Sequence, residues 1–462
     1  MAIKTRYQVF LWLLLTLVGA GYYVQSLVLQ DSHPDFLPGQ TSHGHYQIEL
    51  ACESCHTEPF GSEKVIQNAC LDCHKDELNQ ANDSHPVKKF TDPRNADRLA
   101  ILDARYCVSC HKEHVPQHTR SMGVTLPDDF CEACHKDIAK ERPSHKGMGF
   151  DTCASAGCHN YHDNKALYEN FLLKHSEGEA TKPLDAIIAM IEQATADQLN
   201  SQQATNKKAT QPLTLADANY PTNLETGGDE LVDWEHSGHA NAGVNCGGCH
   251  SNNSQTQGAV SLEQWIAKPS LEQCANCHKD EVTGFTTGKH GMRFAAKANG
   301  EPLPAMSVSE SRLALSNKMH TEAFDNRLTC NSCHSAHKFE RAEAAVESCL
   351  GCHSDEHSTQ FKDTKHAALL TGNGDAMVTC ATCHLPKIEV EKFGQKTTLV
   401  QHNQNHNLRP NEKMIRSVCL DCHSLRFSID ALADPLLLKN NFNGQPSTHI
   451  ESIDMALERE KK

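Results

Sequence analysis

A short pattern, Cys-x-x-Cys-His, holds two thiols and one imidazole at fixed spacing and recurs ten times along the chain. An additional copy, between Cys153 and His159, has two extra residues between its cysteines. We number these units 1 to 11 in chain order. Their cysteine pairs are Cys52 and Cys55, Cys70 and Cys73, Cys107 and Cys110, Cys131 and Cys134, Cys153 and Cys158, Cys246 and Cys249, Cys274 and Cys277, Cys330 and Cys333, Cys349 and Cys352, Cys380 and Cys383, and Cys419 and Cys422. The histidines that follow are His56, His74, His111, His135, His159, His250, His278, His334, His353, His384 and His423.

This pattern is the covalent attachment signature of c-type haem, in which two thiols bond the porphyrin and the histidine binds its iron. Roughly 0.1 regular copies would arise by chance at this Cys and His content. In a helical turn, cysteines at i and i+3 share one face. Unit 5 needs a bulged backbone, and Gly157 suits that conformation. The eleven pairs use all 22 cysteines, so the sequence predicts eleven attached haems c.

Two other uses of paired cysteines fit less well. Zinc ribbons combine two Cys-x-x-Cys knuckles and need no histidine after each. Thioredoxin-like redox sites have one such pair near a βαβ pattern, which this sequence lacks.

The histidines outside the units are candidates for the second axial position on each iron. There are 30 histidines, of which eleven belong to the units, so 19 remain. The candidates in the N-terminal part are His43, His45, His85, His114, His118, His145, His162 and His175, and those in the C-terminal part are His236, His239, His290, His320, His337, His357, His366, His402 and His406. A solvated or propionate-bonded histidine is the alternative for each, and His33 and His449 are poorer candidates. We expect mostly bis-histidine, low-potential haems, because Met122 or Met148 as a ligand would raise the potential.

The expected fold class follows from the small number of residues available for each unit. With 462 residues and eleven units, about 42 residues surround each haem, too few for separate apolar cores. The hydrophobic fraction of 38% and aromatic fraction of 6% are modest. We therefore expect a mainly α protein with much irregular structure, in which stacked haems form the core. Very little β structure is expected, since no long alternating apolar run appears.

The units divide into two groups. Units 1 to 5 and units 6 to 11 are separated by a stretch without Cys or His from residue 176 to 234. Leu184, Ile187, Ile188 and Ile191 recur there at helical spacing after Pro183. We predict a pentahaem module at 31–175, a haem-free linker with one helix at 176–233, a hexahaem module at 234–430 and a helical tail at 431–462. A surface insertion on one continuous haem stack is the alternative for the linker.

Residues 1–30 are predicted to direct export. Lys4 and Arg6 precede an uncharged stretch from Tyr7 to Gln30 that is long enough to span a bilayer. We favour an uncleaved anchor, with the cleaved signal peptide suggested by Val18-Gly19-Ala20 as the alternative. Either places the units on the periplasmic side of the cytoplasmic membrane, anchored or soluble.

The formal charge bears on partners. At −15 the chain is a poor nucleic-acid binder, and a partner that docks by charge would present a basic patch.

The whole chain resembles periplasmic multihaem c-type cytochromes. His85-Pro-Val and the run from Cys107 to His114 resemble low-potential multihaem electron carriers. Gly288-Lys-His-Gly291, the run from Cys380 to Lys387 and His402…His406-Asn-Leu-Arg-Pro410 are similar to the hydroxylamine oxidoreductase and pentahaem nitrite reductase superfamily.

Two departures set the chain apart from those enzymes. The nitrite reductases mark the active haem by Lys in place of the motif histidine, whereas all eleven units here have His. Hydroxylamine oxidoreductases modify the active haem with Tyr, and this chain has no Tyr after Tyr220. Lys279, Arg293, Lys387 and Arg409 could line a substrate pocket, but bonding to propionates is the expectation.

These observations favour an electron carrier over an enzyme. The expected role is transfer between a membrane quinol dehydrogenase or soluble donor and a terminal reductase or periplasmic cytochrome. The alternatives are a reductase or oxidase of a small nitrogen or sulfur compound (nitrite, hydroxylamine, tetrathionate) with one open haem, and a haem-rich filament subunit.

Overall fold

The structure is a computed structural model that describes most of the chain. It covers residues 2–25, 36–58, 61–81, 85–153, 161–163, 167–205, 211–225, 228–251, 259–298, 301–305, 319–338, 340, 343–372, 374–392, 395–408 and 413–461. Cys158 and His159 of unit 5, together with Arg409, lie outside these residues.

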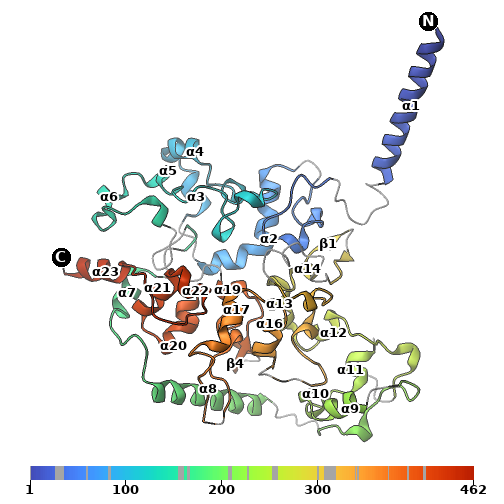
Figure 1. The fold of residues 1–462 in the computed structure, drawn as a ribbon, viewed down its shortest axis with the longest axis vertical. Coiled ribbons are helices and arrows are strands. Elements are labelled where there is room, and N and C mark those ends of the chain that lie inside the picture. The colour runs from blue at the N-terminus through green and yellow to red at the C-terminus, as the bar shows by residue number, and fades with distance from the viewer. Residues whose placement is uncertain are drawn as a thin grey trace.

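The first part of the chain is built from short helical segments joined by irregular stretches (Figure 1). Its helices are α1 (Ala2–Val24), α2 (Glu63–Ala81), α3 (Val87–Phe90), α4 (Ala96–Ile101), α5 (Glu132–His135), α6 (Ile138–Glu141), α7 (Glu169–Lys174) and α8 (Leu184–Thr205). Between them lie the 3₁₀ turns η3 (Tyr46–Ile48), η4 (Cys52–Ser54), η5 (Pro93–Asn95), η6 (Cys107–Ser109), η7 (Pro116–His118), η8 (Ser121–Gly123), η9 (Pro143–His145) and η10 (Phe150–Thr152).

The second part continues in the same style. Its helices are α9 (Gly228–Glu235), α10 (Gly238–Asn241), α11 (Cys246–His250), α12 (Leu271–Ala275), α13 (Lys279–Thr287), α14 (Met292–Ala295), α16 (Ser348–Leu350), α17 (Glu356–Gln360), α18 (Cys380–His384), α19 (Asn405–Leu408), α20 (Leu420–Cys422), α21 (Leu425–Ala433), α22 (Pro435–Lys439) and α23 (Ser452–Glu460). The shorter turns are η11 (Leu215–Asp217), η12 (Leu262–Gln264), η13 (Thr321–Ala323), η14 (Cys330–Ser332) and η16 (Phe361–Asp363), with π-helical η15 (Glu343–Glu347) and η17 (Ile415–Cys419).

Strands contribute two small antiparallel hairpins in the described part of the chain. β1 (Lys297–Ala298) pairs with β2 (Glu301–Pro302), and β3 (Lys387–Lys392) pairs with β4 (Gln395–Val400). In the longer hairpin Lys387 lies opposite Val400. The prediction of a mainly α chain with much irregular structure and very little β is therefore confirmed.

The polypeptide encloses little apolar volume of its own. Its accessible surface is 29338 Å², whereas a compact protein of 51.0 kDa would expose about 17,000 Å². In the described residues of 31–163, the buried apolar side chains are the three alanines Ala51, Ala69 and Ala81. Side chains that small cannot hold together a module of this size, so another component must fill its interior.

The main apolar cluster joins α7 to the C-terminal segments. Its buried members are Leu167, Leu172, Ile415, Leu425, Ile429, Leu432, Ile453 and Ala456. They come from both sides of the linker and from the tail, so the predicted boundaries at 175/176 and 430/431 cut through one packed unit. Likewise α9 crosses the predicted boundary at 233/234. Helix α8 begins directly after Pro183, where the apolar spacing places a helix.

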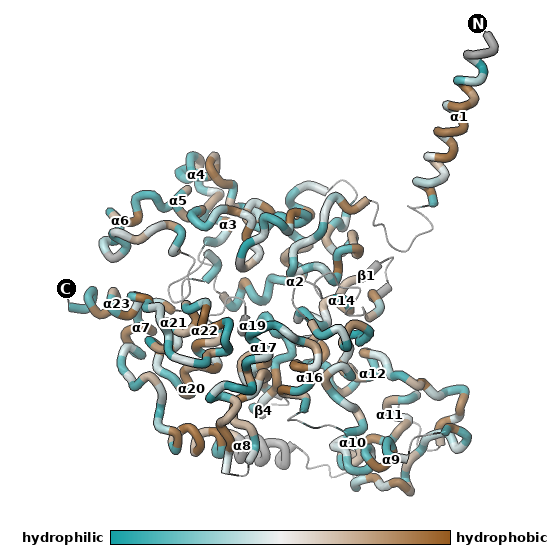
Figure 2. Tube along the Cα trace, in the orientation of Figure 1, coloured by the Kyte–Doolittle hydropathy of each residue, from teal (hydrophilic) through white to brown (hydrophobic). Residues whose placement is uncertain are grey.

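Helix α1 differs from the others in its surface. It is the helix of the described residues that is long and apolar enough to cross a membrane, over Thr5–Val24. Its apolar side chains are exposed, with Trp12 at 64% and Leu17 at 69%. Figure 2 shows this helix as a brown, hydrophobic rod apart from the rest of the chain.

Candidate haem-attachment sites

The ten attachment units that the structure describes in full share one local conformation, a single helical turn. In seven units the backbone N–H of the histidine donates to the carbonyl of the first cysteine, at distances from 2.7 Å (unit 11) to 3.1 Å (unit 8). Units 2, 6 and 10 lie within α2, α11 and α18. A Thr or Asn before the first cysteine caps some turns, as Thr379 does for unit 10 and Asn245 for unit 6. Each turn therefore presents both thiols and the histidine on neighbouring faces, as the spacing predicts.

Nine unit histidines each face one histidine from outside the units. The ring centroids are separated by 5.9 to 6.2 Å. The pairs are His74 with His45, His111 with His162, His135 with His85, His250 with His337, His278 with His239, His334 with His402, His353 with His290, His384 with His357, and His423 with His366.

This spacing is the one that two axial ligands of a single iron require. An imidazole nitrogen binds a metal at about 2.0 Å and the ring centre lies about 1.1 Å behind it, so opposed rings are about 6 Å apart. One aromatic pair at 6 Å would be unremarkable, because stacked and edge-to-face rings fall in the same range. Here every pair combines one unit histidine with one other histidine, and no ring is used twice. The residues therefore fit haem, with a place for iron between each pair.

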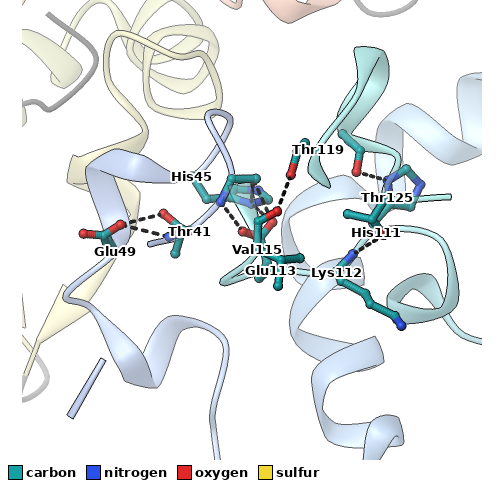
Figure 3. A network of polar contacts seen from close by, with 11 residues as sticks. Thr41, His45, Glu49, His111, Lys112, Glu113, Val115, Thr119 and Thr125 are labelled. Carbon is teal, nitrogen blue, oxygen red and sulfur yellow. Dashed lines mark hydrogen bonds and ion pairs between the residues drawn. The ribbon is translucent and has the colours of Figure 1, made fainter. Parts of the chain in front are cut away.

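Hydrogen bonds to Nδ1 orient five of the paired outer histidines, which leaves Nε2 free to face the partner ring. In Figure 3, the Nδ1 atom of His45 lies 2.6 Å from Oε1 of Glu113, a carboxylate that also accepts from the backbone N–H and hydroxyl of Ser42. Burial alone would raise the pKa of Glu113, but these hydrogen bonds outweigh it and hold the pKa at about 2. An ionised carboxylate behind the ring makes imidazole a stronger iron ligand.

Main-chain carbonyls serve the same purpose elsewhere. The Nδ1 contacts are His85 to Tyr161 O at 2.6 Å, His239 to Ala336 O at 3.0 Å, His357 to Leu438 O at 2.5 Å and His402 to Val400 O at 2.9 Å. Unit histidines do likewise, His111 to Gly123 O at 3.1 Å and His250 to Ile266 O at 2.7 Å. His449 differs, because carboxylates of Asp430 and Asp454 engage both of its ring nitrogens.

Burial keeps several of these rings in the neutral form that binds metals. It lowers the pKa of His290 and of His384 to about 4, with neighbouring histidines adding to the effect. Close packing of the Gly288–Gly291 loop fixes His290. A Cβ atom at Gly291 would lie 2.5 Å from the carbonyl oxygen of Phe285, so only glycine fits there.

Thiols of consecutive units lie next to one another. The first cysteines of neighbouring units interact with one another: Cys70 with Cys107, Cys131 with Cys153, Cys274 with Cys330, and Cys349 with Cys380. Second cysteines approach the other neighbour: Cys55 with Cys73, Cys110 with Cys134, Cys249 with Cys277, Cys333 with Cys352, and Cys383 with Cys422. Burial raises the pKa of Cys110, and the nearby Cys134 raises it further. These contacts thus link units that are consecutive in sequence.

The space around the units is large. A connected cavity of about 4630 Å³ runs through the C-terminal part and is bordered by all six of its units. A pocket for one small molecule holds about 300–1,000 Å³, so this space suits several large cofactors. None of the described cysteines forms a disulfide, which leaves their thiols for thioether bonds.

Eight predicted outer histidines have no place among these nine pairs. His118 in η7 and His236, directly after α9, are exposed, and His43 is exposed at the edge of the cavity. His175 packs on Phe171 with ring centroids 4.5 Å apart. The others, His114, His145, His320 and His406, are partly buried. Among the basic residues expected at propionates, Arg293 instead donates to the carbonyls of Gln47 and Pro304.

Unit 1 is the described unit whose histidine, His56, forms no such ring pair with a described residue. The Glu113 carboxylate, next to His114 in the chain, raises the pKa of Cys55 of this unit further, after the larger effect of burial. The Nδ1 atom of His114 is 2.8 Å from Gly39 O, and its backbone is in the left-handed region with φ 63°. This strained, oriented histidine remains a candidate second ligand for unit 1.

Two important residues escaped the sequence analysis. Glu113 lies inside the quoted run Cys107–His114, so a carboxylate between two histidines was a visible signal. Gln47, which is 1% exposed, has no sequence signal.

Residues 44–136 match the family model of cytochrome c3. No solved structure matches the chain. The match covers units 1 to 4 and supports a multihaem electron-transfer cytochrome with covalently bound haem c. The C-terminal resemblance to hydroxylamine oxidoreductases and nitrite reductases finds no counterpart in this match.

Proposed function

We propose that this protein carries eleven covalently attached haems c and transfers electrons along them between a donor at the membrane or in the periplasm and a terminal reductase. Haem c supplies a one-electron iron couple at each unit. The nine histidine pairs at 5.9 to 6.2 Å carry the proposal, since an iron with two protein ligands has no open position for a substrate. The chain's contribution is to fix the ligands and the spacing of units.

The thiol contacts give the order of units. Because each cysteine is bonded to a porphyrin edge, neighbouring thiols bring neighbouring edges together. The contacts run without a break through units 1 to 5 and through units 6 to 11, always between units consecutive in sequence. We call these two series the N-terminal and C-terminal modules. Within each module, the electron path then follows chain order.

Helix α1 supports an anchor in the cytoplasmic membrane, with the units on the periplasmic side. An isolated helix with its apolar side chains exposed is stable in lipid and not in water. The redox partner, a quinol dehydrogenase or a periplasmic cytochrome or reductase, would then meet the protein close to that membrane.

The second candidate function is a reductase or oxidase of a small nitrogen or sulfur compound. Such a reaction needs an open iron position, and His56 is the described unit histidine that has no opposed histidine among the described residues. Unit 1 is therefore the described unit at which this function would reside.

Ligand binding to the reduced protein separates the two functions. We expect no CO binding beyond unit 1 and no turnover of nitrite, hydroxylamine or tetrathionate with a reduced dye. Turnover of any of these, or CO binding at several irons, would replace electron transfer by the enzymatic function.

A further inference from the structure

We propose that electrons pass between the two modules from unit 2 to unit 9, two internal units, and not between the end units 5 and 6. The inference rests on the proposed electron-transfer function. It adds a branch point, so the protein has four free ends instead of two.

A buried hydrogen-bonded contact joins the modules at this point. The side-chain amide of Gln47 in η3 donates to the carbonyl of Lys289, which lies between α13 and α14. In the opposite direction, Nη1 of Arg293 donates to the carbonyl of Gln47 at 2.7 Å. The Gln47 side chain is 1% exposed, so the contact is closed to water.

The two ends of this contact are next to two iron-facing histidines. Gln47 follows His45 by two residues, and His45 faces His74 of unit 2. Lys289 precedes His290, which faces His353 of unit 9. A short run of covalent bonds and one hydrogen bond therefore connects the outer ligands of units 2 and 9.

Helix α2 strengthens the same assignment. Its Glu77 lies near His406 and Lys413 of the C-terminal module. Helix α19, which holds His406, contacts α18 of unit 10. Figure 1 shows α2 across the middle of the C-terminal module. By contrast, α5 and α6 of the N-terminal module lie at the opposite side of the molecule from α11 of unit 6.

The consequence is a branched conductor. Units 1, 5, 6 and 11 are then the ends of four arms that meet at units 2 and 9. Different partners could donate to one arm and accept from another without competing for one terminal unit.

The test uses methionine as a site label in the full chain. His45→Met and His290→Met should each give one Met-ligated haem with a higher potential and a far-red ferric absorption band. In the double variant, the redox titration of the two labelled irons should be wider than the sum of the titrations of the single variants. The reason is that reduction of one iron removes a positive charge near the other. The control pairs His45→Met with His337→Met at unit 6, and its curve should equal the sum.

The outcomes are distinguishable. Additive curves for His45→Met with His290→Met, or coupling in the control pair instead, would overturn the branch point while leaving the electron-transfer function intact. Absence of any haem absorption in the wild type would instead remove the function itself. If a variant fails to fold, electron cryomicroscopy of the wild-type protein decides. The porphyrins of units 2 and 9 should approach more closely than any other pair across the modules, and a closer approach of units 5 and 6 would refute the proposal.

Discussion

The two modules use the same attachment chemistry but differ in what supports it. In its described residues the N-terminal module buries small alanines, its polar contacts such as Glu113 with His45 are prominent, and His56 of unit 1 forms no ring pair with a described histidine. The C-terminal module has all six units paired and is flanked by the apolar cluster of α7, α21 and α23. The comparison teaches that attached cofactors can replace an apolar core almost completely in one half of a protein while the other half keeps one.

The largest difference should appear when haem attachment is prevented. We expect residues 36–163 to be digested first by protease, because without haem they bury almost no apolar side chains. The cluster around Ile429 should persist longer, since each fully buried large apolar side chain stabilises by about 1.5–3 kcal/mol. Mass spectrometry of the fragments measures this. Equal resistance of both modules would show that the N-terminal module has a core of its own.

Unit 1 offers the next test. We expect His114→Ala to create a high-spin iron that binds one CO per molecule in the reduced protein, because it removes the candidate second ligand of that unit. His118→Ala, at an exposed position in the same segment, is the matched control and should change neither signal. CO titration and electron paramagnetic resonance report the result. If the wild type already binds CO to the same extent, His114 is not the ligand.

The carboxylate behind His45 should tune the potential of unit 2. Glu113→Gln removes the charge that strengthens this ligand, and loss of such a partner weakens metal binding about 10–100-fold. If the loss falls on the ferric state, the potential rises by up to about 60–120 mV. The control is Glu49→Gln, whose carboxylate accepts from Thr41 in the same region (Figure 3). An identical redox titration for both variants would rule out this role of Glu113.

The contact between the modules should contribute measurably to stability. Arg293→Ala leaves the Gln47 carbonyl without its charged donor, which should cost about 1–2 kcal/mol. Arg327→Ala removes a comparable hydrogen bond to Ala305 O at an exposed site and should cost less than about 0.5 kcal/mol. Urea unfolding monitored by haem absorption compares the two. A larger loss in Arg327→Ala would argue against a tight junction at Gln47.

The smallest expected effect is a pH dependence of stability that is confined to the C-terminal tail. Hydrogen bonds from Arg426 and His449 hold the pKa of Asp454 at about 2, and Asp430 and Asp454 raise the pKa of His449. The contribution of the Asp454 carboxylate to the stability of the tail is complete above about pH 4 and is lost as the pH falls toward 2. That of His449 is complete below about pH 6.5 and is lost as the pH rises through its raised value.

The tail should therefore be most stable between about pH 4 and 6.5. His449→Gln should abolish the alkaline loss, which is below about 1 kcal/mol because the side chain is 48% exposed. Thermal unfolding of both proteins at pH 6 and pH 8 tests this. An unchanged pH dependence in the variant would assign the effect to other groups.

The attachment units could be predicted from the sequence because their chemistry is local: Cys70, Cys73 and His74 lie on one helical turn. The mainly α fold could be predicted because about 42 residues per unit are too few for separate apolar cores and no long alternating apolar run appears. The partner of each unit histidine could not be predicted, since His85 and His135 meet only through the tertiary fold. The domain boundaries depended on composition, which gives no sign that Leu172 packs against Ile429 and Ile453 in one cluster. The contact of Gln47 with Lys289 is equally invisible, because a glutamine has no distinctive pattern.

The central claim is that opposed histidines occupy both axial positions of most irons. Quantitative electron paramagnetic resonance of the fully oxidised full-length protein tests it most directly. The nine described pairs predict at least nine low-spin ferric haems per molecule. A spectrum dominated by high-spin iron would contradict the claim.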